Sequence, residues 1–523
     1  MTHLMDHGFH LVSFDMRGTR IPLFTPDTFD LGAKASILIG PNGSGKSRVL
    51  AALADEMTNI HRLRRARIAP DGDDEISTPP RLLNLDRALS PVGDLFAEQA
   101  SMGNPEARVS YHMDGDKWDV ARDGERLHVR RNGQFASIEE MAFPDQVLAI
   151  AHLPIDKFRF ARSVQTRWEE FYKYRGLRQA TNMTTTGALG TKALMSFLAM
   201  AGQPASEAFL KEWLPKLELD PEVSVSLRLP SFLQAALTQP ADLRRLLSNP
   251  DLPIRQARTI EKPETSATLG DDELQALQNL SETIVRPNQT RLTSRRTVTI
   301  DLYPHRDGGQ AASTVLRGLS AMRRFRAGVG AELEFHRNGK VFSFSDLSSG
   351  EQQILTTLSE LVSNIGGTAL VLIDEPEVSL HPRWQRDYVP ALLETLESHP
   401  STHAVIATHS HFMVANLPPG RGSLTVAGRS GSAPYEVYDG EIYGRSPDNI
   451  LYRVFGLGTA GNRFVEIELR RALRMVSGQD AFKRDVLRGI YERLIPLTAD
   501  DNPALGEILS SIKARLGRAA TPD

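Results

Sequence analysis

The chain has 523 residues, a formal net charge of −3 and a hydrophobic fraction of 41%. This length exceeds one ordinary domain, so we expect two or three packed units, and the charge excludes a uniformly basic nucleic-acid coat protein. There is no cysteine, which excludes disulfides, thiolate catalysis and cysteine-ligated zinc. No stretch approaches the roughly 18 apolar residues of a membrane helix and no export signal is recognisable. We therefore predict a cytoplasmic protein without membrane contact.

A glycine-rich turn follows the strands that we predict between about residues 8 and 50. The stretch ASILIGPNGSGKSRVLAALADEM passes from a short apolar strand through G-x-x-x-x-G-K-S into a helical pattern. Glycines let backbone N–H groups and the helix N-terminus surround a phosphate, while Lys46 reaches the β- and γ-phosphates and Ser47 holds Mg²⁺. The pattern therefore predicts an ATP site. Its residues here are Gly40, Asn42, Gly43, Ser44, Gly45, Lys46, Ser47 and Arg48.

Three segments lie between this turn and the next motifs. Residues 107–134 alternate polar and apolar side chains across Asp-Gly and Asn-Gly turns, which predicts a small antiparallel sheet. The apolar run QVLAIA at 146–151 predicts a strand. Residues 159–296 contain prolines at a density that breaks continuous heptads. We therefore predict a compact, mainly helical insert there, with strands returning after residue 296.

Three motifs follow one another in the second half of the chain. LSSGEQQ at 347–353 begins a helix, and the apolar run before Asp374 and Glu375 is typical of a buried strand. The first of these carboxylates would support Mg²⁺ and the second would face the attacking water. AVIATHS at 404–410 is another strand-type run that ends in polar residues, including His409. Such strand ends are often merely structural, but in this order they indicate a nucleotide site.

Together with the glycine-rich turn, these motifs resemble the head of an ABC-type ATPase of the SMC/RecF/OLD-like group. The resemblance implies an α/β fold: a P-loop NTPase head of ABC type with an antiparallel β subdomain, a compact mainly helical insert and a helical C-terminal tail. It implies catalytic roles for Lys46, Glu375 and His409, with Glu375 as the general base or water-orienting carboxylate and His409 as the γ-phosphate sensor. Ser47 and Asp374 would bind Mg²⁺.

In this family the serine-glycine signature completes the ATP site of a second subunit, which would explain why its residues are small. The signature residues are Leu347, Ser348, Ser349, Gly350 and Glu351. Ser349 stands where glycine is usual in the family, and Glu351 where glutamine is frequent. No glutamine ends the strand at 146–151, so we expect His152 or Asp156 to stand in for the family's glutamine loop.

A finer resemblance concerns bacterial anti-phage systems. In EPEVSLHP, residues Glu377, Leu380, His381 and Pro382 match the form common in OLD-like and RecF-like ATPases without long coiled coils. IDKF at 155–158 and SPDNILYRVFGLG at 446–458 look like ATPase subunits of the Septu and retron-associated type. OLD relatives carry a nuclease built on a D-x-D pair, which is missing after His409. A nuclease would thus be a separate chain.

These observations predict a homodimeric or higher-order ATPase that uses ATP and Mg²⁺ and gates a separate effector, a nuclease or toxin, in defence. Alternatives are a RecF/SMC-like DNA-binding repair ATPase, an ATP-binding scaffold with negligible turnover and, least favoured, an importer subunit. Basic clusters at 61–70, 291–297 and 321–328 could contact nucleic-acid backbone, although such clusters are more often solvated surface. The expected domain limits are 1–158 and 297–440 for the two halves of the head, 159–296 for the insert and 441–523 for the helical tail.

Overall fold

The computed structural model describes the chain in fifteen segments. They are residues 8–24, 32–68, 106–153, 156–159, 171–176, 188–201, 204–229, 271–285, 290–294, 297–303, 308–322, 330–428, 434–438, 463–497 and 503–518. The stretch at 446–458 and most of the basic cluster at 321–328 lie outside these segments.

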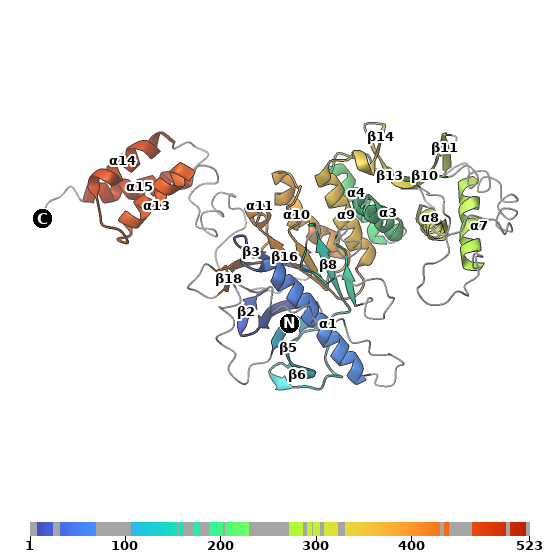
Figure 1. Cartoon of the computed structure of the whole chain (residues 1–523), viewed down its shortest axis with the longest axis horizontal. Coiled ribbons are helices and arrows are strands. Elements are labelled where there is room, and N and C mark those ends of the chain that lie inside the picture. The colour runs from blue at the N-terminus through green and yellow to red at the C-terminus, as the bar shows by residue number, and fades with distance from the viewer. Residues whose placement is uncertain are drawn as a thin grey trace, which may run out of the picture.

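A seven-stranded sheet forms the centre of the head (Figure 1). Its strands are parallel, except that the edge strand β18 runs antiparallel to β17. Four of them, β3, β8, β15 and β16, are buried along their whole length, which explains the apolar runs in the sequence. In spatial order the strands are β18 (Tyr435–Val437), β17 (Gly422–Ala427), β3 (Lys34–Ile39), β16 (Thr402–Thr408), β15 (Ala369–Asp374), β8 (Gln146–Ala151) and β9 (Tyr172–Tyr174).

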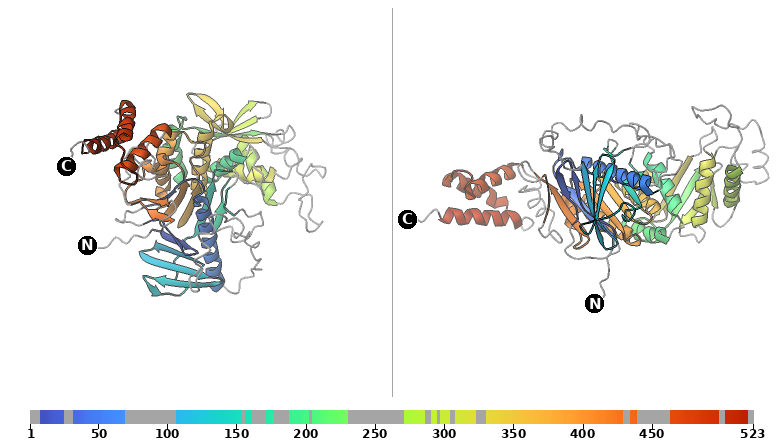
Figure 2. Two further views of the ribbon diagram at one scale, coloured as in Figure 1. Left: turned by 60° about the vertical axis from the view of Figure 1, so that its left-hand side comes forward. Right: turned by 90° about the horizontal axis from the view of Figure 1, so that it is seen from below.

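The two faces of this sheet are covered by different parts of the chain (Figures 1 and 2). On one face, Leu38 and Leu370 pack with helix α1 (Lys46–Ile68) and with an antiparallel sheet. On the other face, Ile37 and Val371 pack with helix α9 (Ser349–Asn364) and its neighbours. Alternate residues of each strand thus serve two separate cores. As a result, α1 and α9 lie on opposite faces of the central sheet.

The antiparallel sheet beside α1 has six strands in the order β2, β1, β4, β5, β6, β7. The segment 107–134 forms four of its strands, as predicted. Asp114 and Gly115, like Asn132 and Gly133, all have positive φ, which is the signature of tight hairpin turns. The strands are β1 (His10–Met16), β2 (Thr19–Pro22), β4 (Ala107–Met113), β5 (Asp116–Asp123), β6 (Arg126–Arg131) and β7 (Gln134–Phe135).

Helices and a five-stranded antiparallel sheet lie on the other side of the central sheet and share a core with its second face. The helices are α3 (Ala188–Met200), α4 (Pro204–Lys216), α7 (Asp271–Val285), α8 (Gly308–Met322), α9, α10 (Pro382–Thr395) and α11 (His411–Ala415). The sheet has the order β11 (Thr290–Ser294), β12 (Thr297–Tyr303), β10 (Val223–Arg228), β13 (Gly330–Arg337), β14 (Lys340–Ser343).

Three strands, β9, β10 and β11, fall in the range 159–296, for which the sequence predicted a mainly helical insert. The signal for β10 was present, because VSVSLR at 223–228 alternates apolar and polar residues. β10 pairs with β12 and β13, so strand pairing crosses the expected limit at residue 296. The four domain limits stay a prediction.

From residue 463 onward, the described residues include three α-helices, α13 (Arg463–Val476), α14 (Arg484–Leu494) and α15 (Pro503–Arg518). They share a core of their own that includes Leu469, Leu487, Ile490 and Ile512. The expected helical tail is confirmed. Among the described helices, none combines the length and apolar character needed to cross a membrane.

Candidate nucleotide site

Strand order brings the separate sequence motifs to one edge of the central sheet. β16 lies between β3 and β15, with Thr408 opposite Ile39 and Ala407 opposite Asp374. β8 lies on the other side of β15 in the same register. Because the strands are parallel, their carboxyl ends meet at this edge, where open α/β sheets bind ligands. The glycine-rich turn at residues 40–48, which we call the phosphate loop, therefore lies at one site with Asp374, Glu375 and His409.

The structure explains why two positions of the phosphate loop carry glycine. Gly45 has a φ of 90°, which L side chains rarely adopt. A Cβ at Gly40 would lie 2.6 Å from the Cβ of Ala427 on β17. The phenol of Tyr435, on the edge strand β18, donates a hydrogen bond of 2.9 Å to the carbonyl of Ser44. Strands β17 and β18, which follow His409 in the sequence, thus support the loop, a contribution that the sequence motifs did not predict.

Lys46 is buried at the centre of the site, with only 4% of the residue exposed. Its Nζ donates to the carbonyl oxygens of Gly40 at 2.9 Å and Pro41 at 3.3 Å, and lies 3.1 Å from Nε2 of His409. Burial lowers the pKa of Lys46 to about 8, although three nearby carboxylates oppose this shift. The ammonium is therefore held by loop carbonyls where a phosphate would provide a stronger partner.

The expected magnesium ligands lie together. The hydroxyl of Ser47 hydrogen-bonds Asp374, and Oδ1 of Asp374 is buried with no hydrogen-bond partner among the described residues. Burial, followed by repulsion from Glu375, Asp156 and Glu377, raises the pKa of Asp374 to about 7. The unpartnered oxygen of the buried Asp374 and the neighbouring hydroxyl of Ser47 are hard oxygen donors of the kind that suit Mg²⁺. When bound, the ion would neutralise phosphate charge beside Lys46.

Glu375 has an unusual backbone conformation, with a φ of 51°. Its N–H donates to the carbonyl of Ala407 at 2.9 Å, and its Oε1 lies 3.8 Å from Nε2 of His409. Such left-handed residues require support from their surroundings and are found at active sites. The conformation directs the carboxylate to the side where Lys46 and His409 meet, while burial and the positive charge of Lys46 lower the pKa of His409.

A third carboxylate, Glu377, connects the two strand ends. Its Oε1 accepts a hydrogen bond of 2.5 Å from the backbone N–H of His409, and burial raises the pKa of Glu377. Nearby, Oε1 of Gln385 on α10 accepts a 2.6 Å hydrogen bond from the hydroxyl of Ser410. Glu377 thus fixes the backbone at His409. The sequence drew attention to Glu377 only as part of a resemblance and gave it no role.

The signature begins helix α9 as its motif predicted. Ser348 is the N-cap residue, and with Glu351 it forms a reciprocal capping box. Ser348 and Ser349 are exposed, whereas Leu347 lies in the core with 5% exposure. Leu347 is therefore placed to anchor the segment, while the two serines face outward. The nucleotide-binding roles of Leu347, Ser348, Ser349, Gly350 and Glu351 stay predictions.

Contacts within the same chain explain why position 350 carries glycine. A Cβ at this position would lie 2.7 Å from the indole of Trp384 and 3.0 Å from the carbonyl of Ser379. Trp384 belongs to the first turn of α10, which starts with the N-cap His381 and Pro382. The Leu-His-Pro stretch is thus a helix start that brings an aromatic side chain under the signature.

We expect Gly350→Ala to lower the free energy of unfolding by about 1–3 kcal/mol, because the added methyl group overpacks the contact with Trp384. Chemical denaturation by urea would measure the change. Ser349→Ala, one residue earlier and exposed, is the matched control and should change stability by no more than about 0.5 kcal/mol. Equal effects of the two substitutions would contradict the packing argument.

The two candidates for the glutamine loop lie in different environments. His152 is buried after β8, and its Nε2 lies 3.2 Å from the hydroxyl of Thr357 on α9. Asp156 accepts hydrogen bonds from the phenol of Tyr174 at 2.5 Å and from the N–H of Phe158 at 3.0 Å. Its charge contributes to the raised pKa of Asp374. Asp156 is therefore the candidate beside Asp374, and His152 contacts the signature helix.

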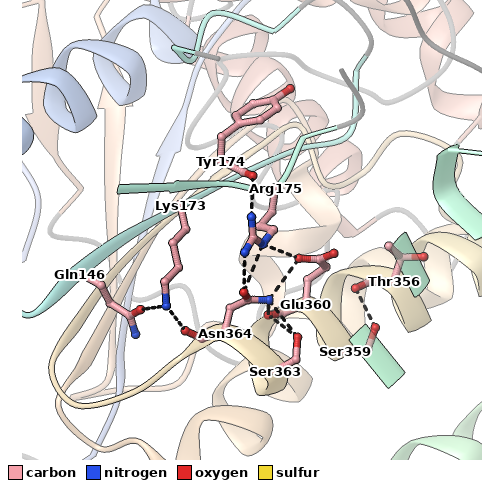
Figure 3. A network of polar contacts seen from close by, with 9 residues as sticks. All are labelled: Gln146, Lys173, Tyr174, Arg175, Thr356, Ser359, Glu360, Ser363 and Asn364. Carbon is pink, nitrogen blue, oxygen red and sulfur yellow. Dashed lines mark hydrogen bonds and ion pairs between the residues drawn. The ribbon is translucent and has the colours of Figure 1, made fainter. Parts of the chain in front are cut away.

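The far end of α9 is attached to the edge of the central sheet by polar contacts (Figure 3). Arg175 donates to Oδ1 of Asn364 at 2.6 Å and forms an ion pair of 2.9 Å with Glu360. Lys173 Nζ donates to the carbonyl of Asn364 at 2.9 Å and to Gln146 at 2.8 Å. These bonds make the signature helix and strands β8 and β9 one connected unit.

The strand order, the convergent motifs and the signature helix on the opposite face define an ABC-type P-loop head, and the predicted fold class is confirmed. A sequence profile described as "AAA domain, putative AbiEii toxin, Type IV TA system" matches residues 214–415. Over part of its length the chain is thus similar to this family and to proteins named as retron ATPases.

Three relatives show the extent of this similarity. "Retron Ec83 probable ATPase" of Escherichia coli is 27% identical over 183 residues, which are 32% of this chain and 31% of that protein. "Retron Vc95 probable ATPase" of Vibrio cholerae is 28% identical over 92 residues, 16% and 17% of the two chains. "Protein ea59" of phage lambda is 39% identical over 72 residues, 14% of each chain. The match thus spans less than a third of each relative's length.

Among solved structures, the SMC head domain from Thermotoga maritima aligns with 83% of this chain and 98% of its own, at 10% identity and a TM-score of 0.28. The assignment of the fold rests on the strand order and the site described above.

Proposed function

We propose that this protein is an Mg²⁺-dependent ATPase whose two heads associate around ATP and gate a separate effector, a nuclease or toxin, in anti-phage defence. The convergence of Lys46, Ser47, Asp374, Glu375 and His409 at one sheet edge carries the first part of this proposal. Lys46 would contact phosphate, Ser47 and Asp374 would hold the metal, and Glu375 would take a proton from water.

Association of two heads is supported by the position of the signature. α9 packs on α3, α4 and α10, whereas α1 packs on β8, β15 and β16. The exposed serines Ser348 and Ser349 therefore belong to the opposite face of the sheet from the helix that follows the phosphate loop. Each ATP site in the proposed assembly takes its signature from a second chain, so hydrolysis and association are coupled.

The gating of an effector is supported by two features of the sequence. The prolines between the phosphate loop and the signature interrupt the heptads that a long coiled-coil arm needs, and the sequence after His409 contains no D-x-D pair. The names of the two retron relatives are consistent with a defence role. In this proposal, the state of the nucleotide alters the association of the heads and thereby the release of the partner chain.

The test is affinity capture of tagged Glu375→Gln protein from its own host with Mg-ATP present, with mass spectrometry of the co-purifying chains. This substitution should keep ATP bound and the heads together, so that a partner stays attached. We expect a stoichiometric nuclease or toxin, which should be lost with Glu375→Gln/Lys46→Ala because the phosphate contact is removed. Recovery of the protein alone with DNA would instead establish the repair-type clamp and refute the defence role.

A further inference from the structure

Both oxygens of Glu351 are engaged beneath the signature. Oε2 accepts hydrogen bonds from the backbone N–H and from the hydroxyl of Ser348, each at 2.7 Å. Oε1 accepts a bond from the guanidinium of Arg337, on strand β13. Only 9% of the Glu351 side chain is exposed. The largely buried carboxylate of Glu351 thus keeps the hydroxyl proton of the exposed Ser348 in a hydrogen bond.

Arg337 is itself fixed in place. Its Nη2 also donates to the carbonyl of Leu217 at 3.1 Å, and its Nε to the carbonyl of Glu218 at 3.2 Å. The guanidinium therefore links β13, the end of α4 and the first turn of α9. Its position beside Oε1 provides the carboxylate of Glu351 with a positive counter-charge from the same chain.

The negative charge of Glu351 therefore lies close to the place where the γ-phosphate of ATP would bind in the proposed assembly. The N-terminus of α9 attracts anions through its backbone N–H groups and helix dipole. Glu351 already satisfies this preference in the first turn, and it also engages the Ser348 hydroxyl, a donor that a γ-phosphate would need. A phosphate at the signature must therefore displace the hydroxyl from Glu351, while Arg337 limits the repulsion between the two anions.

We propose that the Glu351–Arg337 pair sets the ATP concentration at which the two heads associate, with Glu351 opposing and Arg337 favouring engagement of the signature. This inference rests on the proposed ATP-dependent association. It assigns both residues as positioning residues, which act through Ser348 and through the charge at the helix N-terminus.

The experiment measures the mass of the full-length Glu375→Gln protein by light scattering during an Mg-ATP titration, with and without further substitutions. Glu351→Gln removes the negative charge, and because Oε2 alone accepts both bonds from Ser348, a neutral amide at this position holds the hydroxyl less strongly than the carboxylate does. We expect the half-maximal ATP concentration to fall about tenfold, the equivalent of one charge-assisted hydrogen bond. Arg337→Gln should raise it by about the same factor, because Glu351 loses its counter-charge.

The double substitution distinguishes a role of Arg337 as a counter-charge to Glu351 from a purely structural role. If Arg337 acts by balancing Glu351, then Glu351→Gln/Arg337→Gln should behave like Glu351→Gln alone, within about twofold. If the half-maximal ATP concentration of the double variant stayed as high as that of Arg337→Gln, Arg337 would serve only to link α4 and β13. That result would overturn the proposal. So would an unchanged midpoint for Glu351→Gln.

Glu332→Gln is the matched control, since Glu332 accepts a 2.6 Å hydrogen bond from the hydroxyl of Ser345, just before the signature. It should leave the midpoint unchanged, and a shift equal to that of Glu351→Gln would contradict a specific role for the pair. Failure of the Glu375→Gln parent to associate with any ATP would refute the proposed function itself. Association of the parent with unaltered midpoints in the variants would refute only the role of the pair.

Discussion

Glu375→Gln should reduce ATP turnover by about 10²–10⁴-fold, the usual contribution of a positioned general base, and leave ATP binding intact. The substitution keeps the size of the side chain and the backbone bond to Ala407, but removes the group that would accept a proton from water. Phosphate release at saturating Mg-ATP would give the turnover, and the fluorescence of a labelled ATP analogue would give the affinity. Equal losses in both would indicate a collapsed site.

Glu377→Gln provides the comparison within the same loop. Its amide oxygen can still accept from the N–H of His409, so the histidine should keep its position. We therefore expect a decrease in turnover much smaller than that of Glu375→Gln. If instead Glu375→Gln retained a third or more of the normal rate, while Glu377→Gln lost nearly all of it, the assignment of the base to Glu375 would be wrong.

The sequence located the head of this protein because its motifs depend on local geometry. A phosphate loop needs glycine at positions such as Gly45, where φ is 90°, and such requirements are visible in the residue types themselves. The hairpins at 107–134 were equally visible, because Asp-Gly and Asn-Gly turns combine with strict alternation. Asp374 and Glu375 were identified because a buried parallel strand is a continuous apolar run whose end is polar.

The supporting contacts could not be read in the same way, because they join residues far apart in the chain. Tyr435 binds the carbonyl of Ser44 from a strand 391 residues away, and nothing in the local sequence marks that tyrosine. The sequence explanation of Gly350 was incomplete, since Trp384 and Ser379 already leave no room for a side chain. For Glu351, the sequence showed only a departure from a pattern, whereas the structure shows its two partners.

His152 offers a test of how the signature helix is attached to the central sheet. Burial, followed by repulsion from Lys192, lowers the pKa of His152 from 6.5 to about 4. The folded chain therefore keeps this side chain neutral while the unfolded chain takes up a proton below pH 6.5. Stability from His152 is fully present above that pH and is lost as the pH falls toward 4.

We expect the stability advantage of the wild-type chain over His152→Gln to shrink by about 2 kcal/mol between about pH 7.5 and pH 5, as the linkage relation requires. Glutamine can preserve a polar contact with Thr357 and does not titrate, so the comparison isolates one imidazole from the other buried groups. Urea unfolding of both proteins at the two pH values gives the difference, with the exposed position His128 substituted in the same way as a control. A gap between wild type and His152→Gln that does not change with pH would mean that His152 is reached by water. In that case the bond to Thr357 would not be the buried link through which strand β8 holds the signature helix.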